Sequence, residues 1–128
     1  MENEIYNDLT RKIIGAAIEV HRNLGPGLLE NVYNMALNYE LQRLGLNSQR
    51  EVPLPVIYKG LCLELGYRAD IIVEDKIIVE LKAVESLSKL HQKQLLTYLR
   101  ISDKRLGLLI NFNEAILCNG IQRVVNKL

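Results

Sequence analysis

The sequence lacks several features that would assign a protein to a common functional class. Its 128 residues carry 16 basic and 15 acidic side chains, so the net charge of +1 produces no overall positive field for tight, non-specific nucleic-acid binding. No apolar stretch approaches the roughly 20 residues of a membrane span. The opening segment MENEIYNDLTRK is too polar for a secretory signal. We therefore expect a cytoplasmic protein without a membrane-spanning segment.

Common motifs for zinc and for nucleotides are also missing. The only cysteines are Cys62 and Cys118, and the only histidines are His21 and His91, so a zinc site is not expected. Each cysteine follows a leucine in a strand-like segment, and we interpret both as reduced core thiols. Neither GxxxxGK[ST] nor GxGxxG occurs, which leaves little support for nucleotide-dependent catalysis.

What is present is the composition of a folded chain, 48% hydrophobic and 24% charged, without repeats or low-complexity tracts. We expect one domain over residues 1–128. Apolar spacing predicts helices at 6–23, 28–44 and 86–101, the last capped by Ser86 or Ser88. Alternating or wholly apolar runs predict strands at 48–60, 61–68, 71–73, 77–79, 105–112 and 115–125. Within the last run, the Asn-Gly pair at 119–120 is typical of a hairpin turn.

This order of elements predicts an α/β fold of the mixed α+β kind. The segment between Glu80 and Leu109 is long enough for a helical crossover to a parallel strand. Strands whose side chains are apolar at both odd and even positions must be buried on both faces of their sheet. We therefore expect a central mixed β-sheet flanked by helices on both faces.

The segment RADIIVEDKIIVELKA, residues 68–83, places charges at the ends of the most apolar strands. Glu80 and Lys82 are two residues apart and point to one face. A two-residue loop at 74–75 would set Asp70 opposite Val79, whereas a three-residue loop at 74–76 sets it opposite Glu80. A functional site therefore predicts the three-residue loop or a bulge.

Two neighbouring carboxylates repel each other unless a cation lies between them. Mg²⁺ prefers one or two carboxylates, several waters and phosphate oxygens, and a nearby lysine would orient water or stabilise charge on a phosphate. The alternative is that Asp70 ends a strand while Glu80 and Lys82 form an ion pair. The position of these charges inside apolar strands favours a functional role.

The pattern Asp70…Glu80-Leu81-Lys82 resembles the D…ExK signature of the PD-(D/E)XK phosphodiesterase superfamily, although Ala69 stands where a proline often precedes the first acid. GLLENVY, residues 27–33, is similar to the motif that names the GxxExxY proteins, small prokaryotic members of the superfamily. EVHRNLGPG and LGLLINF also resemble that family, and the similarity extends from about residue 13 to 123.

This resemblance implies a restriction-endonuclease-like core and metal-dependent cleavage of nucleic-acid phosphodiester bonds. It implies that Asp70 and Glu80 bind Mg²⁺ or Mn²⁺, with the main-chain carbonyl of Leu81 as a third ligand, and that Lys82 is the catalytic lysine. Glu30, by itself a first-turn acid favoured by the helix dipole, would hold a metal-bound water. Tyr33 would be mostly core, with its hydroxyl at the rim of the site.

The third predicted helix carries further candidates. Gln94 and Tyr98 lie on one line of the helix, where related helicase-associated exonucleases have a QxxxY motif that positions substrate and the lysine. Their alternative interpretation is a surface amide beside a half-buried tyrosine. Lys89, Lys93 and Arg100 form a basic edge for a phosphate backbone or simply a solvated face, and His91 is a weaker candidate for phosphate contact.

Two functions follow. The first is a Mg²⁺-dependent nuclease whose partner is nucleic acid, DNA before RNA, with a homodimer as a way to enlarge the binding surface. The second is a non-catalytic module that keeps the nuclease fold and binds nucleic acid or protein. The first is favoured because the two acids, the lysine, the extra carboxylate and the Gln94–Tyr98 pair are all present.

Overall fold

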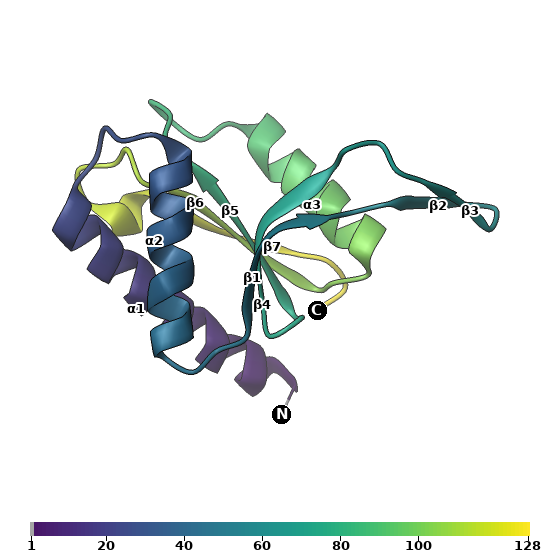
Figure 1. Cartoon of the computed structure of the whole chain (residues 1–128), viewed down its shortest axis with the longest axis horizontal. Helices are drawn as coiled ribbons and strands as arrows, with labels where there is room; N and C mark the ends of the chain where they lie inside the picture. The colour runs from purple at the N-terminus through teal and green to yellow at the C-terminus, as the bar shows by residue number, and fades with distance from the viewer. Residues whose placement is uncertain (1) are drawn as a thin grey trace.

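The computed structural model describes residues 2–128 and contains three long helices and seven strands within that range (Figure 1). The elements are, in chain order, α1 (Glu2–Leu24), α2 (Glu30–Arg43), β1 (Ser48–Pro53), β2 (Val56–Tyr58), β3 (Leu61–Leu63), β4 (Arg68–Val73), β5 (Ile77–Lys82), α3 (Lys89–Ser102), β6 (Leu106–Asn111), the short 3₁₀ helix η1 (Leu117–Gly120) and β7 (Ile121–Val125). Among these residues no helix combines the length and the apolar character needed to cross a bilayer.

Five strands form the main sheet in the order β1-β4-β5-β6-β7. The β5–β6 pair is parallel and joined through α3, whereas the other pairs are antiparallel. Helices α1 and α2 cover one face and α3 covers the other (Figure 1). The predicted mixed sheet with helices on both faces is therefore confirmed.

The alternation of side chains in β4 and β5 divides the core into two halves. Ile71 and Val79 pack among the residues of α1 and α2, while Ile72 and Ile78 pack with Leu95, Tyr98 and Leu99 of α3. Both halves are buried, since the core residues on each face of these strands are apolar and 0–8% exposed. Glu80 and Lys82 continue the alternation of Ile78, so they lie on the α3 side at the end of β5.

Helix α3 is capped at its start and lies close to the sheet at its middle. Ser88 is its N-cap, confirming one of the two predicted caps, and His91 completes the capping box. In β6, a Cβ atom at Gly107 would lie 2.9 Å from three side-chain atoms of Leu95, which is shorter than any ordinary contact. The helix can therefore approach β6 this closely because residue 107 has no side chain.

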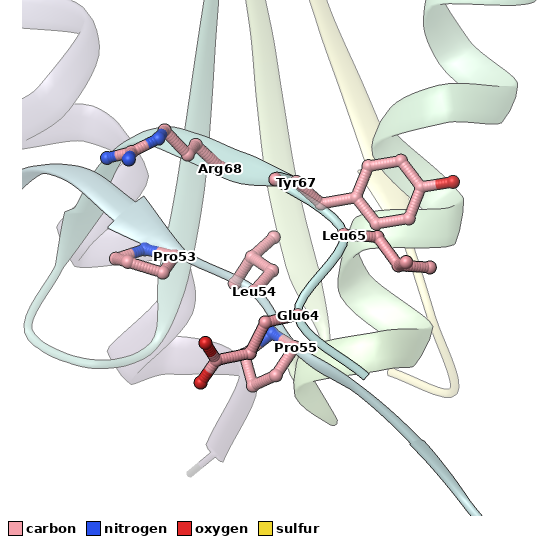
Figure 2. Close-up of a pocket in the computed structure, with 8 residues that line it drawn as sticks. Pro53, Leu54, Pro55, Glu64, Leu65, Tyr67 and Arg68 are labelled. Atoms are coloured by element: carbon pink, nitrogen blue, oxygen red, sulfur yellow. The ribbon is translucent and has the colours of Figure 1, made fainter. Parts of the chain in front are cut away.

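Strands β2 and β3 form a separate two-stranded hairpin that projects beyond the main sheet (Figure 1). Lys59 and Gly60 make its turn with positive φ values of 48° and 80°, as a two-residue hairpin turn requires. Several of its apolar side chains face solvent, among them Tyr58, which is 58% exposed. The neck of the hairpin borders a cavity of about 390 Å³ lined by residues 53–55 and 64–68 (Figure 2).

Two predictions about local structure are wrong. Cys62 and Cys118 are free, as predicted, but both are exposed rather than in the core, because Cys62 lies on the projecting hairpin and Cys118 in η1. Residues 115–125 do not form a hairpin around 119–120. Residues 117–120 form η1 instead, and β7 begins only at Ile121 and pairs with β6.

Candidate active site

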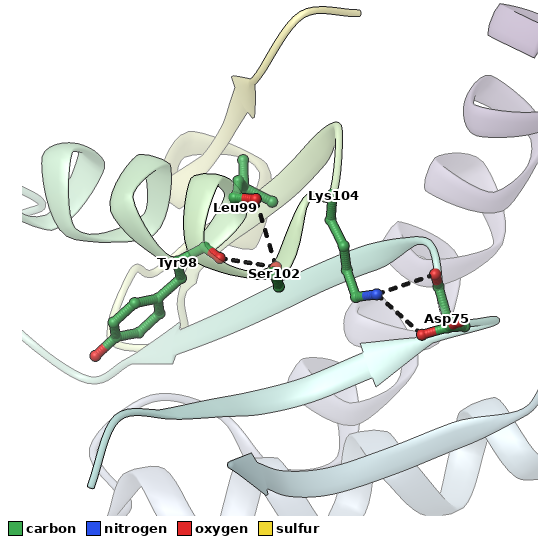
Figure 3. Close-up of polar contacts among 5 residues, drawn as sticks. All are labelled: Asp75, Tyr98, Leu99, Ser102 and Lys104. Atoms are coloured by element: carbon green, nitrogen blue, oxygen red, sulfur yellow. Dashed lines mark hydrogen bonds and ion pairs between the residues drawn. The ribbon is translucent and has the colours of Figure 1, made fainter. Parts of the chain in front are cut away.

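The loop between β4 and β5 has three residues, 74–76, as the functional interpretation predicted. Val73 pairs with Ile77 and Ile71 with Val79, where the ladder ends, and this register continued by one residue places Asp70 across from Glu80. Glu74 and Asp75 both have a φ of 53°, and the Lys76 N–H donates to the Val73 carbonyl over 3.0 Å. The Lys104 ammonium lies 2.9 Å from Asp75 Oδ1, which ties this loop to the end of α3 (Figure 3).

The carboxyl groups of the two predicted acids are hydrogen-bonded to the main chain of the opposite strand and not to one another. The Asp70 N–H donates to Glu80 Oε2 over 2.7 Å, and the Leu81 N–H donates to Asp70 Oδ2 over 2.9 Å. The N–H and C=O of one strand residue point to the same edge of the strand, so the Leu81 carbonyl is directed into the same gap between β4 and β5. Three oxygen donors therefore converge where the strands separate.

The surroundings of the acid pair disfavour two negative charges. Glu80 is 6% exposed, and burial followed by the Asp70 charge raises its pKa from 4.5 to about 8. Burial is also the main cause that raises the pKa of Asp70, opposed by its hydrogen bond from Leu81 and by the Lys82 charge. The protein thus holds two carboxyl groups in a place that favours a proton or another cation.

Lys82 is half-buried at the end of β5, and its positive charge acts on both carboxyl groups. The chain around it is fixed by Asn111, which is fully buried on the neighbouring strand. The Asn111 amide donates to the Val84 carbonyl over 2.9 Å, and its oxygen accepts from the Val84 N–H over 3.1 Å. The backbone that leaves the site is therefore rigidly attached to β6.

A small pocket of about 180 Å³ opens on the α2 side of the pair, lined by Glu30, Asn31, Asn34, Glu51, Asp70 and Leu81. The structure brings Glu30 to Asp70 and Leu81, as predicted, whereas Glu80 does not line this pocket. The negative charges of Glu30 and Glu51 both raise the pKa of Asp70. Within residues 2–128, no three His, Cys, Asp or Glu side chains form a ready-made metal cluster.

The sequence analysis missed the polar residues Asn31, Asn34 and Glu51, which line this pocket, and Arg50, which binds two of them. Asn34 is 4% exposed, and its amide donates to the Asp70 carbonyl and to Glu51 Oε1, both over 3.3 Å. Arg50 Nε donates to Asn34 Oδ1 over 2.6 Å. The signal for Asn34 was available, since it follows Glu30 by four residues on the apolar side of α2. Glu51 gave none, because its position depends on a φ of 52° within β1.

Gln94 and Tyr98 come together on α3 in the predicted way. Gln94 Nε2 donates to the Tyr98 hydroxyl over 3.0 Å, and Tyr98 is 8% exposed. Burial raises the pKa of Tyr98, and the charge of Glu80 is the next largest cause. Tyr98 packs in the same core cluster as Ile72 and Ile78, so it lies on the face of the sheet to which Glu80 points.

Tyr33 lies in the core, as predicted, but its hydroxyl does not lie at the rim of the site. It is fully buried and stacked on Phe112 with ring centroids 4.5 Å apart. Its hydroxyl donates to the Gly25 carbonyl over 2.6 Å and accepts from the Leu28 N–H over 3.0 Å. The hydroxyl fastens the loop before α2 and does not reach the pocket, so the expected position at the rim is wrong.

The basic edge of α3 points away from the acid pair. Lys89, Lys93 and Arg100 are exposed, but at 100° per residue they lie about 140–180° around the helix from Tyr98. His91 is half-buried, and its Nδ1 accepts from the Ser88 N–H over 3.0 Å. These residues therefore do not adjoin the acid pair, and His91 has a structural task at the start of the helix.

Comparison with known proteins gives one match. A sequence model described as the PD-(D/E)XK nuclease superfamily matches residues 7–124, which is nearly the whole chain. No curated protein and no solved structure matches significantly. The matched range contains Glu30, Asp70, Glu80, Lys82 and the Gln94–Tyr98 pair.

Proposed function

The chain belongs to the PD-(D/E)XK nuclease superfamily, and from this premise we propose that it is a Mg²⁺- or Mn²⁺-dependent nuclease that hydrolyses phosphodiester bonds in nucleic acids. Membership suggests a nuclease, and the α+β fold agrees with a restriction-endonuclease-like core. The proposal adds the metal, the role of each residue and DNA as the first substrate to test.

The donor set fits a hard divalent cation. Asp70 Oδ2 and Glu80 Oε2 each accept one main-chain hydrogen bond, while Asp70 Oδ1 and Glu80 Oε1 make no protein hydrogen bond within the described part of the chain. With the Leu81 carbonyl these are oxygen donors only, too few to enclose an ion without water. Mg²⁺ tolerates that arrangement because it retains several waters, whereas zinc prefers nitrogen and sulfur ligands.

A bound ion would supply a Lewis acid that polarises the phosphate and makes water more acidic. Lys82, half-buried beside both acids, would place a positive charge where negative charge develops on the phosphate and would orient the attacking water. Glu30 would hold a water in the pocket that it shares with Asp70. The Gln94 amide and the Tyr98 hydroxyl would position the substrate on the α3 side.

The observation that carries this proposal is that the carboxyl groups of Asp70 and Glu80 each accept a main-chain hydrogen bond from the other's strand, with Lys82 two residues beyond Glu80. The test incubates the purified protein with single-stranded and duplex DNA and RNA in Mg²⁺ or Mn²⁺. We expect cleavage that chelation stops and that Asp70→Asn, Glu80→Gln and Lys82→Ala each reduce by at least about a hundred-fold, as loss of a residue that stabilises a transition state does.

Matched controls are Lys76→Ala and Asp8→Asn, which change an exposed lysine of the β4–β5 loop and an exposed acid of α1. Both should cleave like the parent. Cleavage that survives Lys82→Ala, or that Lys76→Ala reduces equally, would contradict the assignment of the lysine.

The alternative is a non-catalytic module, and one observation favours it: both acids already brace the β4–β5 hairpin through main-chain hydrogen bonds. Under this alternative no cleavage occurs, and Asp70→Asn and Glu80→Gln leave nucleic-acid binding unchanged. Under the nuclease proposal both variants lose cleavage and the metal response together.

A further inference from the structure

We propose that Tyr67, at the neck of the β2–β3 hairpin, is a platform on which an unpaired base of the substrate stacks next to the reacting phosphate. The inference rests on the proposed nuclease function and adds the substrate class, a single-stranded or locally unpaired nucleic acid. It uses a residue that neither the motifs nor the proposed catalytic set contain.

Tyr67 is exposed and yet fixed against the site. Its side chain is 41% exposed, and its ring centroid lies 6.0 Å from that of Tyr98 at an angle of 50°. The Leu54 N–H donates to the Tyr67 carbonyl over 2.8 Å, which fixes the backbone. Tyr98 in turn belongs to the same core cluster as Ile72 and Ile78, which lie two residues from Asp70 and Glu80 on β4 and β5. One buried ring therefore separates the exposed ring from the acid pair.

The neck offers what a nucleobase requires, which is an apolar flat surface with polar groups nearby. The 390 Å³ cavity is bordered by Pro53, Pro55, Leu65 and Tyr67, with Glu64 and Arg68 as its charged residues. Figure 2 shows Tyr67 and Arg68 leaving the chain in opposite directions, so the cation does not cover the ring. A tyrosine also loses little conformational freedom when it makes such a contact.

Unpaired bases are favoured over a duplex for two reasons. A base stacked on a protein ring must leave its own stack, which costs least where it is already unpaired. With a net charge of +1 the chain offers little attraction to any phosphate backbone, so binding must draw on stacking, which is open to unpaired bases and not to the paired bases of a duplex. The hairpin carries a second exposed ring, Tyr58, but the Lys59 ammonium lies over it at 5.5 Å from its centroid, so Tyr67 is the ring that we assign to stacking.

The experiment measures binding without cleavage, in a Lys82→Ala background. Single-stranded oligonucleotides that carry 2-aminopurine, a base whose fluorescence falls on stacking, are titrated with protein in Mg²⁺. We expect Tyr67→Ala to raise the Kd roughly 5- to 100-fold and to remove the quenching, as loss of one stacking ring does. Tyr67→Phe keeps the ring and should behave like the parent.

The control variant is Tyr39→Ala, which removes a ring that is 60% exposed on α2. It should bind like the parent, and unfolding in urea should show that each variant is folded. With Lys82 restored, Tyr67→Ala should raise KM for a single strand more than it lowers kcat.

The possible failures are distinguishable. If the parent cleaves with the expected dependence on Asp70, Glu80 and Lys82 but Tyr67→Ala binds and quenches like the parent, only the stacking inference falls. If Tyr67→Phe loses as much as Tyr67→Ala, or if duplex binds as tightly as single strand, the inference is also overturned. If Tyr67→Ala changes only the oligomeric state, the neck is a subunit interface. If the parent neither binds nor cleaves nucleic acid, both proposals fail.

Discussion

Replacing Glu80 by glutamine should make the metal-free protein more stable, although it removes a residue from the heart of the site. Glu80 is 6% exposed, and its pKa is raised from 4.5 to about 8, first by burial and then by the Asp70 charge. Glutamine keeps an oxygen that can accept from the Asp70 N–H. It removes only the ionisation.

The direction of the pH dependence follows from linkage. Because the pKa of Glu80 is higher in the folded state, the folded protein holds this proton at pH values where the unfolded chain has released it. The free energy of unfolding therefore falls as pH rises from about 4.5 to about 8. Integrated to pH 7, the loss is on the order of 3 kcal/mol from this group.

The assay is urea unfolding between pH 4.5 and 8, in EDTA. We expect the parent to lose stability across this range, and Glu80→Gln to lose much less and to be the more stable protein at pH 7–8. Glu85→Gln, which changes an exposed acid just beyond β5, should follow the parent. A Glu80→Gln variant that is less stable than the parent at pH 8, or that keeps the full pH dependence, would refute the reasoning.

Divalent metal should offset most of the stability difference that we expect between the parent and Glu80→Gln in EDTA. An ion between the carboxyl groups stabilises the parent by about 2.7 kcal/mol at a concentration one hundred times its Kd. Glu80→Gln and Asp70→Asn should lose most of that gain in a thermal melt with Mg²⁺ or Mn²⁺. A parent whose melting temperature does not respond to either ion would contradict the metal site.

Three further changes test the surrounding structure. Tyr33→Phe leaves the Gly25 carbonyl without its donor and should lower the free energy of unfolding, measured in urea, by about 1–3 kcal/mol. Its response to metal should be unchanged, and a loss of that response would place Tyr33 at the site. Gly107→Ala should lower the free energy of unfolding by about 1–3 kcal/mol because the new methyl group crowds Leu95. A double-mutant cycle should show that Leu95→Ala destabilises the Gly107→Ala protein less than it destabilises the parent. His91→Ala should cost about 1 kcal/mol by removing the capping box, and parent-like stability would show that the cap is unimportant.

The parts that sequence could predict are those fixed by local spacing. The i, i+4 relation brings Gln94 to Tyr98 in any regular helix, and a three-residue loop suffices to set Asp70 opposite Glu80. The two-sided apolar strands required cover on both faces, which the helices provide.

The parts that sequence could not predict depend on contacts between distant segments or on unusual backbone. The Tyr33 hydroxyl is bonded within the loop at Gly25, and nothing in the helical spacing of α2 indicates that. Asn34 reaches Asp70 only because α2 crosses the sheet at that strand. Residues 56–63 alternate like any other hairpin, so their separation from the main sheet, and the exposure of Cys62 and Tyr58, are properties of the assembled fold.

Gly107 has a consequence for recognising active members among similar sequences. It sets the clearance between α3 and the sheet, and through that clearance the distance of Tyr98 from the acids on β4 and β5. In a relative with a bulkier residue at position 107 and no smaller residue at position 95, α3 would lie further from the sheet. If Tyr98 positions the substrate as proposed, such a protein would carry every signature residue and still lack activity, so the residue at position 107 should be checked together with the motifs.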